Sequence, residues 1–340
     1  MQHVAIDLGG QESQICVRDD KGQLVEEVRW GTRKLAQYLR GQPMSRIVME
    51  TSSEAFHLAD LAMEMGHEVK VVPSALAPTL GVGSRGVKTD RRDARVLSEV
   101  SSRIELPSVH IPSTKSRERK AACTARESLV SARTQLINTV RGWLRTQLLS
   151  VRTCVPSVFP ERVRRAALAG ESGHALYIEQ ILVVIESLNQ QIAGADKELK
   201  QMAQHDTLCQ LLMTVPGVGT VTAIRFIAAV DDVSRFATAH QLQSFLGLVP
   251  GENSNSNRKQ RTSITKAGPP RVRWALGQAV WSMRKARPLD PLVQWALQVE
   301  KRRGRKIAMT AMARRLAGIM YAMWRDQARY QPSKLLQRQP

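Results

Sequence analysis

The sequence lacks paired cysteines, long apolar runs and a recognisable amino-terminal leader, and each absence excludes a class of protein. Its four cysteines are scattered along 340 residues, without the short spacing of a zinc site or a redox pair. We therefore expect neither a disulfide framework nor bound zinc, and reduced thiols as in the cytosol. No apolar stretch reaches the length of a membrane span, and the first residues, HVAID, enter a predicted strand directly. These features predict a soluble, cytoplasmic protein without a membrane partner.

Negative charge is also scarce, and its distribution is uneven. The chain has 50 Lys and Arg against 30 Asp and Glu, a formal net charge of +20. Residues 1–70 hold 8 basic and 11 acidic residues, whereas residues 251–340 hold 20 basic and 4 acidic residues. Such one-sided charge predicts a polyanionic partner. A slightly acidic first part and a basic last part of the chain fit a metal site combined with a surface that binds nucleic acid. A basic surface that serves only solubility is the alternative.

Hydrophobic patterning in the first third of the chain predicts a mixed α/β domain. Two strands flank an Asp20-Lys21-Gly22 turn that is typical of a hairpin. Two later strands alternate with helices, and Ser53 can cap the second of these helices. The five expected strands are residues 3–8, 13–18, 23–30, 46–50 and 68–72. Three successive strands followed by two that alternate with helices indicate one mixed sheet.

Two long helices are predicted in the middle of the chain, over residues 115–149 and roughly 172–203, separated by the proline-containing residues 154–160. The second helix carries apolar residues in alternating steps of three and four, which is a coiled-coil heptad pattern. They are Ile178, Ile181, Ile185, Leu188, Ile192, Ala195, Leu199 and Met202. We expect this stripe to pair with a second copy of the chain. The alternative is an antiparallel hairpin with the first long helix of the same chain.

The last third of the chain is predicted to be mainly helical. Thr214–Gly219 (TVPGVG) resembles a helix-hairpin-helix turn, whose glycines let backbone amides approach a phosphate; an ordinary turn is the alternative. Two basic amphipathic helices are expected at residues 270–286 and 306–325. Their tryptophans are expected in the helix core rather than as stacking platforms for bases: Trp274, Trp281 and Trp324. Four segments are expected along the whole chain. They are a mixed α/β domain 1–112, a helical coiled-coil region 113–207, a carboxyl-terminal domain 208–330 and a disordered tail 331–340.

Four carboxylates are candidates for a site that binds Mg²⁺ and cuts phosphodiesters. Asp7 lies within the first predicted strand, where a charge is costly unless it has a function. Glu50 ends the fourth strand, and Asp90 and Asp93 share one face of a predicted helix. Mg²⁺ prefers hard oxygen ligands, and two such ions can stabilise both the attacking and the leaving oxygen of a phosphoryl transfer. Taken alone, Asp90 could be a helix N-cap and Glu50 a solvated loop residue.

Other acids of this region are interpreted as surface charges of the hairpin: Asp19, Asp20, Glu26 and Glu27.

Six motifs stand out along the chain: AIDLGG (5–10), VMETSS (48–53), KTDRRDARVL (88–97), TVPGVG (214–219), FLGLVPGENS (245–254) and SITKAG (263–268). With these motifs the chain resembles the DEDD transposases of bridge-RNA-guided insertion sequences, a family that includes the Piv/MooV-type DNA invertases. The resemblance covers nearly the whole chain. It implies an RNase H-like (RuvC-like) amino-terminal domain in which the four acids bind Mg²⁺.

The resemblance also implies a carboxyl-terminal transposase domain with a nucleophilic serine. This serine follows the Gly-Leu-x-Pro segment and precedes the Ile-Thr-Lys-Ala-Gly segment, which makes it Ser254. Family members commonly have a Ser-Ser-Gly-Gly-like stretch after an aromatic residue or His, whereas this chain has Asn-Ser-Asn-Ser-Asn at residues 253–257. Ser256 is therefore the alternative. Without the resemblance, this segment reads as a polar Ser/Asn-rich loop.

The reaction and partners implied by the resemblance go further. A structured guide RNA encoded by the element (the bridge RNA) pairs with target and donor DNA, so that base pairing supplies specificity. The serine forms a phosphoserine intermediate, and strand exchange gives a Holliday-type junction. The acids of one protomer complete the serine site of another, in a dimer that becomes a tetramer in synapsis. Residues expected to contact phosphates are Arg85, Lys88, Arg91, Arg92, Arg258, Lys259, Arg261, Lys266, Arg271 and Arg273.

Three other functions remain open at this point. A RuvC-like junction resolvase would need the acids and not the serine. A site-specific invertase would use the same machinery as a transposase. A non-catalytic binding protein built around the helix-hairpin-helix turn would need neither the acids nor the serine.

Overall fold

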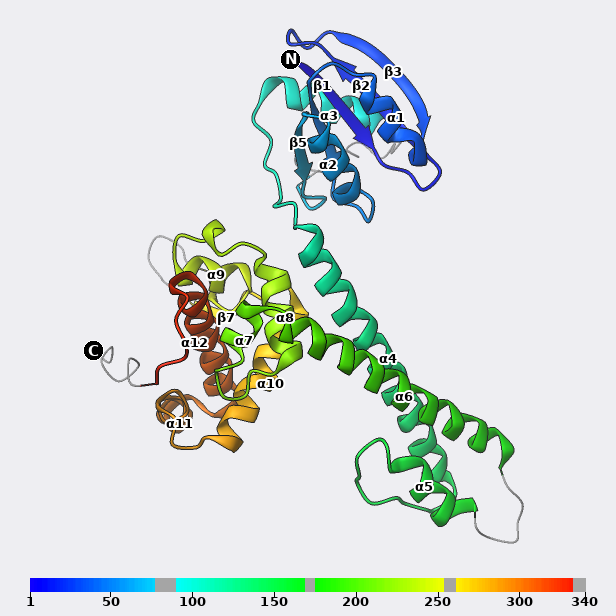
Figure 1. Ribbon diagram of the computed structural model, residues 1–340, viewed down its shortest axis with the longest axis vertical. Helices are drawn as coiled ribbons and strands as arrows, with labels where there is room; N and C mark the ends of the chain where they lie inside the picture. Colours follow the sequence, from blue (N-terminus) through cyan, green and yellow to red (C-terminus); the bar gives the residue numbers. More distant parts are fainter. Residues whose placement is uncertain (77–89, 169–174, 254–260, 333–340) are drawn as a thin grey trace. The chain divides into compact units, whose positions relative to one another are not determined.

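The computed structural model describes residues 1–76, 90–168, 175–253 and 261–332 (Figure 1). The chain divides into two compact units, residues 1–112 and 113–340. Within the described residues, no helix is both long and apolar enough to cross a membrane.

The amino-terminal unit is built on a five-stranded mixed sheet with the order β3-β2-β1-β4-β5. Its strands are β1 (Gln2–Asp7), β2 (Glu12–Arg18), β3 (Leu24–Gly31), β4 (Ser45–Glu50) and β5 (Glu68–Val72). Strand β2 is antiparallel to both β1 and β3, while β4 is parallel to β1 and β5 is parallel to β4. The predicted mixed sheet is therefore confirmed.

The two faces of this sheet are covered by different helices, because successive side chains of a strand point to opposite faces. Val4 and Ile6 pack in one buried cluster with residues of α1 (Leu35–Arg40) and α2 (Ala55–Glu64). The short helix η1 (Thr32–Lys34) leads into α1. Ala5 and Val48 pack in a second cluster with Leu97 of α3 (Asp90–Arg103). Helix α3 therefore covers the face to which the odd-numbered residues of β1 project.

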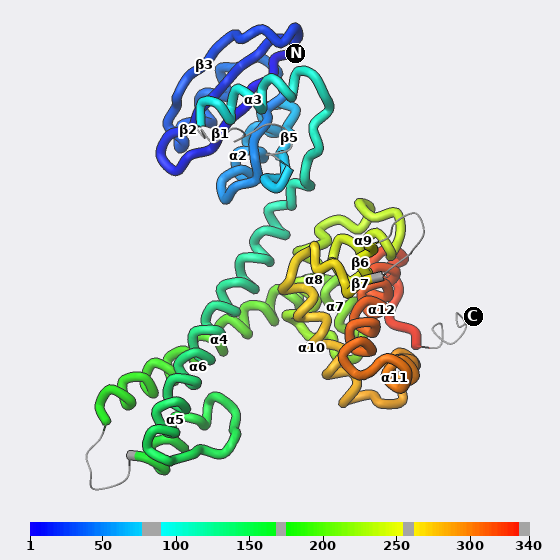
Figure 2. Tube along the Cα trace, turned by 180° about the vertical axis from the view of Figure 1, so that it is seen from behind, coloured from blue at the N-terminus to red at the C-terminus, as the bar shows by residue number. Residues whose placement is uncertain are grey.

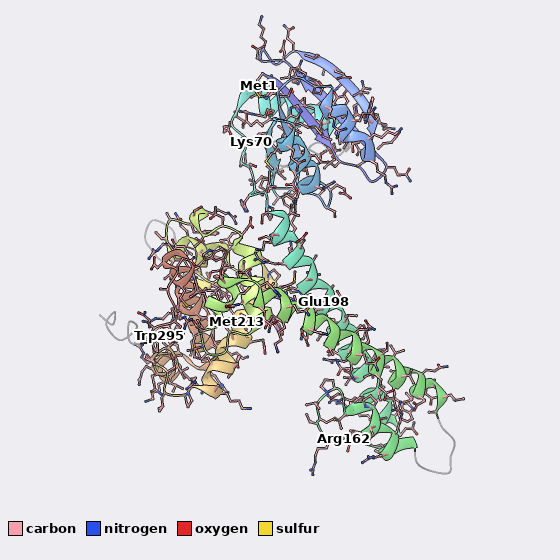
Figure 3. The ribbon with its side chains drawn as sticks, viewed as in Figure 1. Met1, Lys70, Arg162, Glu198, Met213 and Trp295 are labelled. Carbon is pink, nitrogen blue, oxygen red and sulfur yellow. The ribbon has the colours of Figure 1, made fainter. Side chains whose placement is uncertain are left out.

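A network of ion pairs lies on the α3 face of β4 and β5. Arg46 bonds to Glu68 at 3.0 Å and lies 3.4 Å from Glu105, a residue that follows α3. Lys70, labelled in Figure 3, pairs with both Glu68 and Glu105. The pKa of Glu105 is held below its usual value by Lys70. These pairs connect the chain segment that follows α3 to the strands.

The second unit begins with two long helices, α4 (Thr114–Thr146) and α6 (Leu176–Gln204), which pack side by side (Figure 2). Arg126 of α4 bonds to Asp196 of α6, and Arg133 bonds to Asn189 at 2.9 Å, so the two helices run antiparallel. Four residues of the α6 heptad stripe are buried within the chain: Ile178, Ile185, Ile192 and Leu199. The expectation that this stripe pairs with a second chain is therefore wrong for these residues, because α4 of the same chain covers them.

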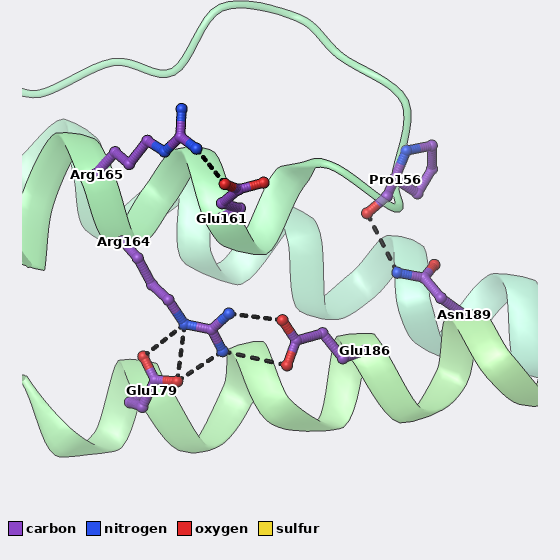
Figure 4. Close-up of polar contacts among 7 residues, drawn as sticks. All are labelled: Pro156, Glu161, Arg164, Arg165, Glu179, Glu186 and Asn189. Atoms are coloured by element: carbon purple, nitrogen blue, oxygen red, sulfur yellow. Dashed lines mark hydrogen bonds and ion pairs between the residues drawn. The ribbon is translucent and has the colours of Figure 1, made fainter.

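The far end of this helical hairpin is held by a three-residue ion cluster (Figure 4). It joins α6 to the single π-helical turn η3 (Arg164–Leu168), which follows α5 (Phe159–Val163). Arg164 bonds to Glu179 at 2.6 Å and to Glu186 at 2.6 Å. Its guanidinium lowers the pKa of Glu186. Asn189 Nδ2 donates to the Pro156 carbonyl at 3.3 Å and so attaches the proline-containing segment to α6.

The carboxyl-terminal part of this unit has six helices among its described residues and a short hairpin, β6 (Pro250–Glu252) and β7 (Arg261–Ile264). The helices are α7 (Thr207–Leu212), α8 (Thr220–Val230), α9 (Ala239–Phe245), α10 (Pro270–Ala286), α11 (Pro291–Arg303) and α12 (Arg305–Asp326), with a 3₁₀ turn η4 (Val233–Arg235). Helix α8 is buried along nearly its whole length, since it contacts α4, α6, α7 and α10. It is therefore the centre of the core.

The TVPGVG turn joins α7 to α8, and its first glycine is required by packing. Gly217 has a φ of +86°, and a Cβ there would lie 2.4 Å from the Ala279 carbonyl oxygen of α10. At Gly219, in contrast, an added Cβ would meet no described atom within 4 Å. Gly217 thus serves the contact with α10, and the approach of backbone amides of this turn to a phosphate stays a prediction.

The tryptophans of the last helices differ in burial. Trp324 of α12 is only 9% exposed, as expected for a core residue. Trp274 and Trp281, both on α10, are 56% and 39% exposed. The core assignment is therefore wrong for these two residues.

Candidate active site

Two of the four candidate acids end adjacent strands. Strands β1 and β4 are parallel and pair Ile6 with Met49, so Asp7 and Glu50 are neighbours at the same end of the sheet. Both are partly buried. Asp7 follows Ala5 by two residues and therefore projects to the same face, the one that α3 covers. The same alternation places Glu50 on this face.

Asp93 is brought to the same face by α3. It is 2% exposed and lies one helical turn before Leu97, which packs against the sheet. The direction of α3 follows from two bonds to the strands. Ser101 bonds to His3 at 2.9 Å, and Ser98 bonds to Cys16, the partner of Ala5, at 3.1 Å. Helix α3 thus runs antiparallel to β1.

The level of Asp93 along the sheet follows from this direction. Asp93 precedes Ser98 by five residues, which is about 7.5 Å along a helix. Asp7 follows Ala5 by two residues, which is about 6.6 Å along a strand. Asp93 and Asp7 therefore lie at a similar level. Asp90, at the exposed start of α3, is a further turn beyond.

Helix α3 is held in this position by an ion cluster that the sequence did not reveal. Glu27 of β3 bonds to Arg91 at 2.8 Å and to Arg95 at 2.5 Å. These two guanidinium groups lower the pKa of Glu27 from 4.5 to about 2. Glu27, interpreted above as a surface charge, is therefore an anchor for the first two turns of α3. The spacing of Arg91 and Arg95, one turn apart, was the only available signal.

The loop after Asp7 is also tightly organised. Thr32 Oγ1 donates to the Gly9 carbonyl at 2.7 Å and lies 2.8 Å from Ser13 Oγ. The Gly9 amide donates to Ser13 Oγ at 3.3 Å. A Cβ on Gly9 would lie 2.2 Å from the Glu12 carbonyl oxygen, so only glycine fits. The conformation of the residues that follow Asp7 is therefore determined by backbone and hydroxyl contacts.

The donor chemistry of these acids fits a hard divalent cation, because each supplies carboxylate oxygens. Among the side chains that the structure describes, however, no three His, Cys, Asp or Glu residues form a group that could hold a metal ion. Asp7, Glu50 and Asp93 each take part in other polar or ionic interactions. The acids thus share a face and a level, and they would have to move closer together to bind one ion.

The second half of the candidate site lies partly outside the described residues. This applies to Ser254, Ser256, Arg258 and Lys259, and also to Arg85 and Lys88. The flanking strands β6 and β7 pair in antiparallel fashion, with Pro250 opposite Ile264. Arg261 is described only as part of β7.

The base of this hairpin is closely packed. The Lys266 amide donates to the Gly247 carbonyl at 3.1 Å, and a Cβ on Gly268 would lie 1.8 Å from the Phe245 carbonyl oxygen. Arg273 Nη1 donates to the carbonyls of Leu246, at 3.1 Å, and Gly268, at 2.5 Å. The two chain segments that carry the hairpin are therefore joined rigidly, and Arg273 has an internal structural role.

The other expected phosphate contacts differ in their surroundings. Arg91 pairs with Glu27, and Arg271 pairs with Glu127 of α4. Arg92 and Lys266 are exposed. Their roles in binding nucleic acid remain predictions.

In a comparison with known protein families, two transposase families match separate segments of the chain. Residues 4–148 match a family described as transposase, the DEDD type of IS110. Residues 209–293 match the transposase IS116/IS110/IS902 family. All four candidate acids lie within the first matched segment, and Ser254 lies within the second.

Several relatives match over nearly the full length. The transposase for insertion sequence element IS1111A of Coxiella burnetii is 28% identical over 96% of this chain and 90% of its own length. A probable family 20 transposase of Pseudomonas aeruginosa is 25% identical over 98% of this chain and 99% of its own. The transposase for insertion sequence element IS1328 of Yersinia enterocolitica is 25% identical over 94% of this chain and 96% of its own.

Proposed function

We propose that the chain is a transposase of the IS110/IS116 family of insertion sequences and that it cleaves and rejoins DNA with four acids and a serine. The observation that carries this proposal is the placement of Asp7, Glu50 and Asp93 on one face of the sheet, at one end. Carboxylates placed at one end of one sheet face, with Asp93 only 2% exposed, lower the stability of a fold, and a function is the usual reason for them. The strand order, with acids ending the central strands, supports an RNase H-like domain.

The acids would hold Mg²⁺ at the α3 face of the sheet. When bound, such an ion polarises a phosphate oxygen and stabilises the negative charge that develops on it. Asp7 and Glu50 come from the sheet, while Asp90 and Asp93 come from the first turn of α3. The position of that turn depends on the ion pairs of Glu27.

Ser254 would act as the nucleophile. Its Oγ forms a bond to a DNA phosphorus, and the bond from that phosphorus to a deoxyribose oxygen breaks, leaving a hydroxyl on the released strand. A hydroxyl of the recipient strand then attacks the phosphoserine and frees the serine, so the number of phosphodiester bonds is conserved. Cations near the segment would stabilise the phosphate charge: Arg258, Lys259, Arg261 and Lys266. Rejoining by this route needs no external energy source.

The partners that we propose are target and donor DNA and a structured guide RNA encoded by the element. The net charge of +20 supports polyanionic partners. A second copy of the chain would supply the acids that complete each serine site. Apolar side chains exposed on α6 support such an oligomer: Leu176, Tyr177, Val183 and Val184.

A complementation experiment tests the composite site. Wild-type protein and the variants Ser254→Ala, Ser256→Ala and Asp93→Asn are incubated with Mg²⁺, the guide RNA and DNA carrying the target and donor sites. Covalent protein–DNA species are then separated in denaturing gels. We expect them with wild-type protein and with Ser256→Ala, and neither with Ser254→Ala nor with Asp93→Asn. A mixture of the two inactive variants should regain part of the activity, because one protomer supplies the serine and another the acids.

Two outcomes would overturn parts of this proposal. Strand cleavage by Ser254→Ala without any covalent species would indicate a metal-only nuclease of the junction-resolvase type. Failure of the mixture to regain activity would place the acids and the serine in one protomer. The guide RNA is tested separately, by purifying the protein from cells that carry its flanking DNA and sequencing the RNA bound to it. Recovery of no discrete RNA would contradict the guided reaction.

A further inference from the structure

A groove of about 410 Å³ lies between α10 and α12, beside the base of the β6–β7 hairpin. Its walls include Trp274, Gly277 and Trp281 from α10 and Lys306, Met309 and Thr310 from α12. We propose that this tryptophan groove binds single-stranded DNA next to the cleavage point, with the Trp274 ring stacked on an unpaired base. The inference rests on the proposed function, because that function brings a DNA strand to the hairpin.

The two tryptophans form an exposed aromatic face on one side of α10. They are seven residues apart, which is two helical turns and about 10.5 Å along the axis. Trp274 is 56% exposed and Trp281 is 39% exposed. The Arg305 guanidinium lies 4.6 Å from the centre of the Trp281 ring. Aromatic rings interleaved with cations are typical of surfaces that bind single-stranded nucleic acid, since every base has a face on which a ring can stack.

Gly277 keeps the space between the two indoles open. It lies in the interior of α10, where glycine lowers helix stability relative to alanine. Packing does not require it, because an added Cβ would meet no described atom within 4 Å. A residue that weakens its own helix without a packing reason indicates that the space beside it is used.

The positive charge at one end of the groove also lowers the stability of the helix that carries it. Five of the six residues from Lys301 to Lys306 are cations, and the whole run is exposed. Arg305 and Lys306 occupy the first turn of α12, where a cation opposes the helix dipole. Lys266 lines the groove on the hairpin side. Phosphates of a bound strand would offset this repulsion, which makes a nucleic-acid strand the complementary partner.

The position of the groove favours DNA over RNA. Leu248 lies just before β6, and Ile264 and Lys266 end and follow β7; all three line the groove. These strands flank residues 254–260, which contain the proposed nucleophile. A serine that attacks DNA lies beside the DNA strand that it cleaves, so a strand bound in this groove is expected to be that DNA.

Binding of a labelled thymidine 12-mer by the full chain tests the inference, with Ser254→Ala present in every protein so that no cleavage occurs. Trp274→Ala should weaken binding of the single strand about 5- to 150-fold, the range for loss of one stacked base. Binding of a 12-base-pair duplex should change less than about twofold. Trp274→Phe should retain most of the affinity. Ile307→Ala is the matched control, since Ile307 is an exposed apolar residue of α12 that does not line the groove.

Gly277→Leu gives a second measurement that fills the groove without removing a ring or a charge. It should weaken single-strand binding to a similar extent while the unfolding temperature does not fall. Equal losses for single strand and duplex, or no loss with Trp274→Ala, would overturn the inference. A uridine 12-mer that binds more tightly than the DNA and depends on Trp274 would reassign the groove to RNA. Since no cleavage is measured, failure of the serine mechanism would not produce any of these results.

Discussion

The ion pairs of Glu27 allow a quantitative test of how α3 and its two acids are held on the sheet. We predict that Glu27→Gln destabilises the amino-terminal unit at pH 7. A fall in pKa from 4.5 to about 2 corresponds to at most about 3.4 kcal/mol. The side chains of Arg91 and Arg95 are 64% and 45% exposed, so solvent screens the pairs. We therefore expect a loss of about 1–2 kcal/mol.

The dependence on pH follows from the direction of the shift. The carboxyl of Glu27 has a lower pKa in the folded chain than in the unfolded chain. Its stabilisation is therefore complete above pH 4.5 and is lost as the pH falls from 4.5 towards 2. The difference between Glu27→Gln and wild type should roughly halve at pH 3.

Urea denaturation at pH 7 and pH 3 measures this effect, with pulsed hydrogen exchange of α3 peptides to report on the amino-terminal unit alone. Glu12→Gln is the matched control. Glu12 lies 3.6 Å from Arg29 on the same sheet, and both side chains are more than 60% exposed. Its loss should cost less than about 0.5 kcal/mol. Equal effects of the two substitutions at pH 7 would refute the view that Glu27 anchors α3.

Three further predictions test contacts of the second unit. Gly217→Ala should destabilise the carboxyl-terminal core by about 2–4 kcal/mol in chemical denaturation, whereas Gly219→Ala should change it by less than about 0.5 kcal/mol; equal effects would contradict the contact with α10. Arg225→Met should cost about 2–3 kcal/mol, seen as a lower Tm, because Arg225 is 7% exposed and bonds to Glu127 at 2.6 Å. Arg164→Met should cost under about 1 kcal/mol and speed hydrogen exchange in α5 and η3 alone; faster exchange in α8 would contradict a local role.

Much of the amino-terminal unit was predictable because its signals are local. Short apolar runs and a hairpin turn located the five strands, and the order of strands and helices indicated one mixed sheet. The alternation of side chains along a strand then places Asp7 and Glu50 on one face as soon as β1 and β4 pair in parallel. Helical spacing likewise places Asp93 on the side of α3 that carries Leu97. Short-range periodicity therefore contained most of the information about the candidate metal site.

The sequence by itself determined the strands, the long helices, the excess of positive charge and the four acids, because these depend on residues near one another in the chain. The tertiary structure decided which surfaces meet. The heptad stripe of α6 predicts that another helix packs against it, and only the fold shows that this helix is α4. From the sequence Gly217 is only a residue of a predicted turn, and its contact with α10 is visible only in the fold. Glu27 is likewise interpreted as a surface charge until the fold brings Arg91 and Arg95 to it from 64 and 68 residues away. Such contacts arise from the packing of distant segments, which no local pattern encodes.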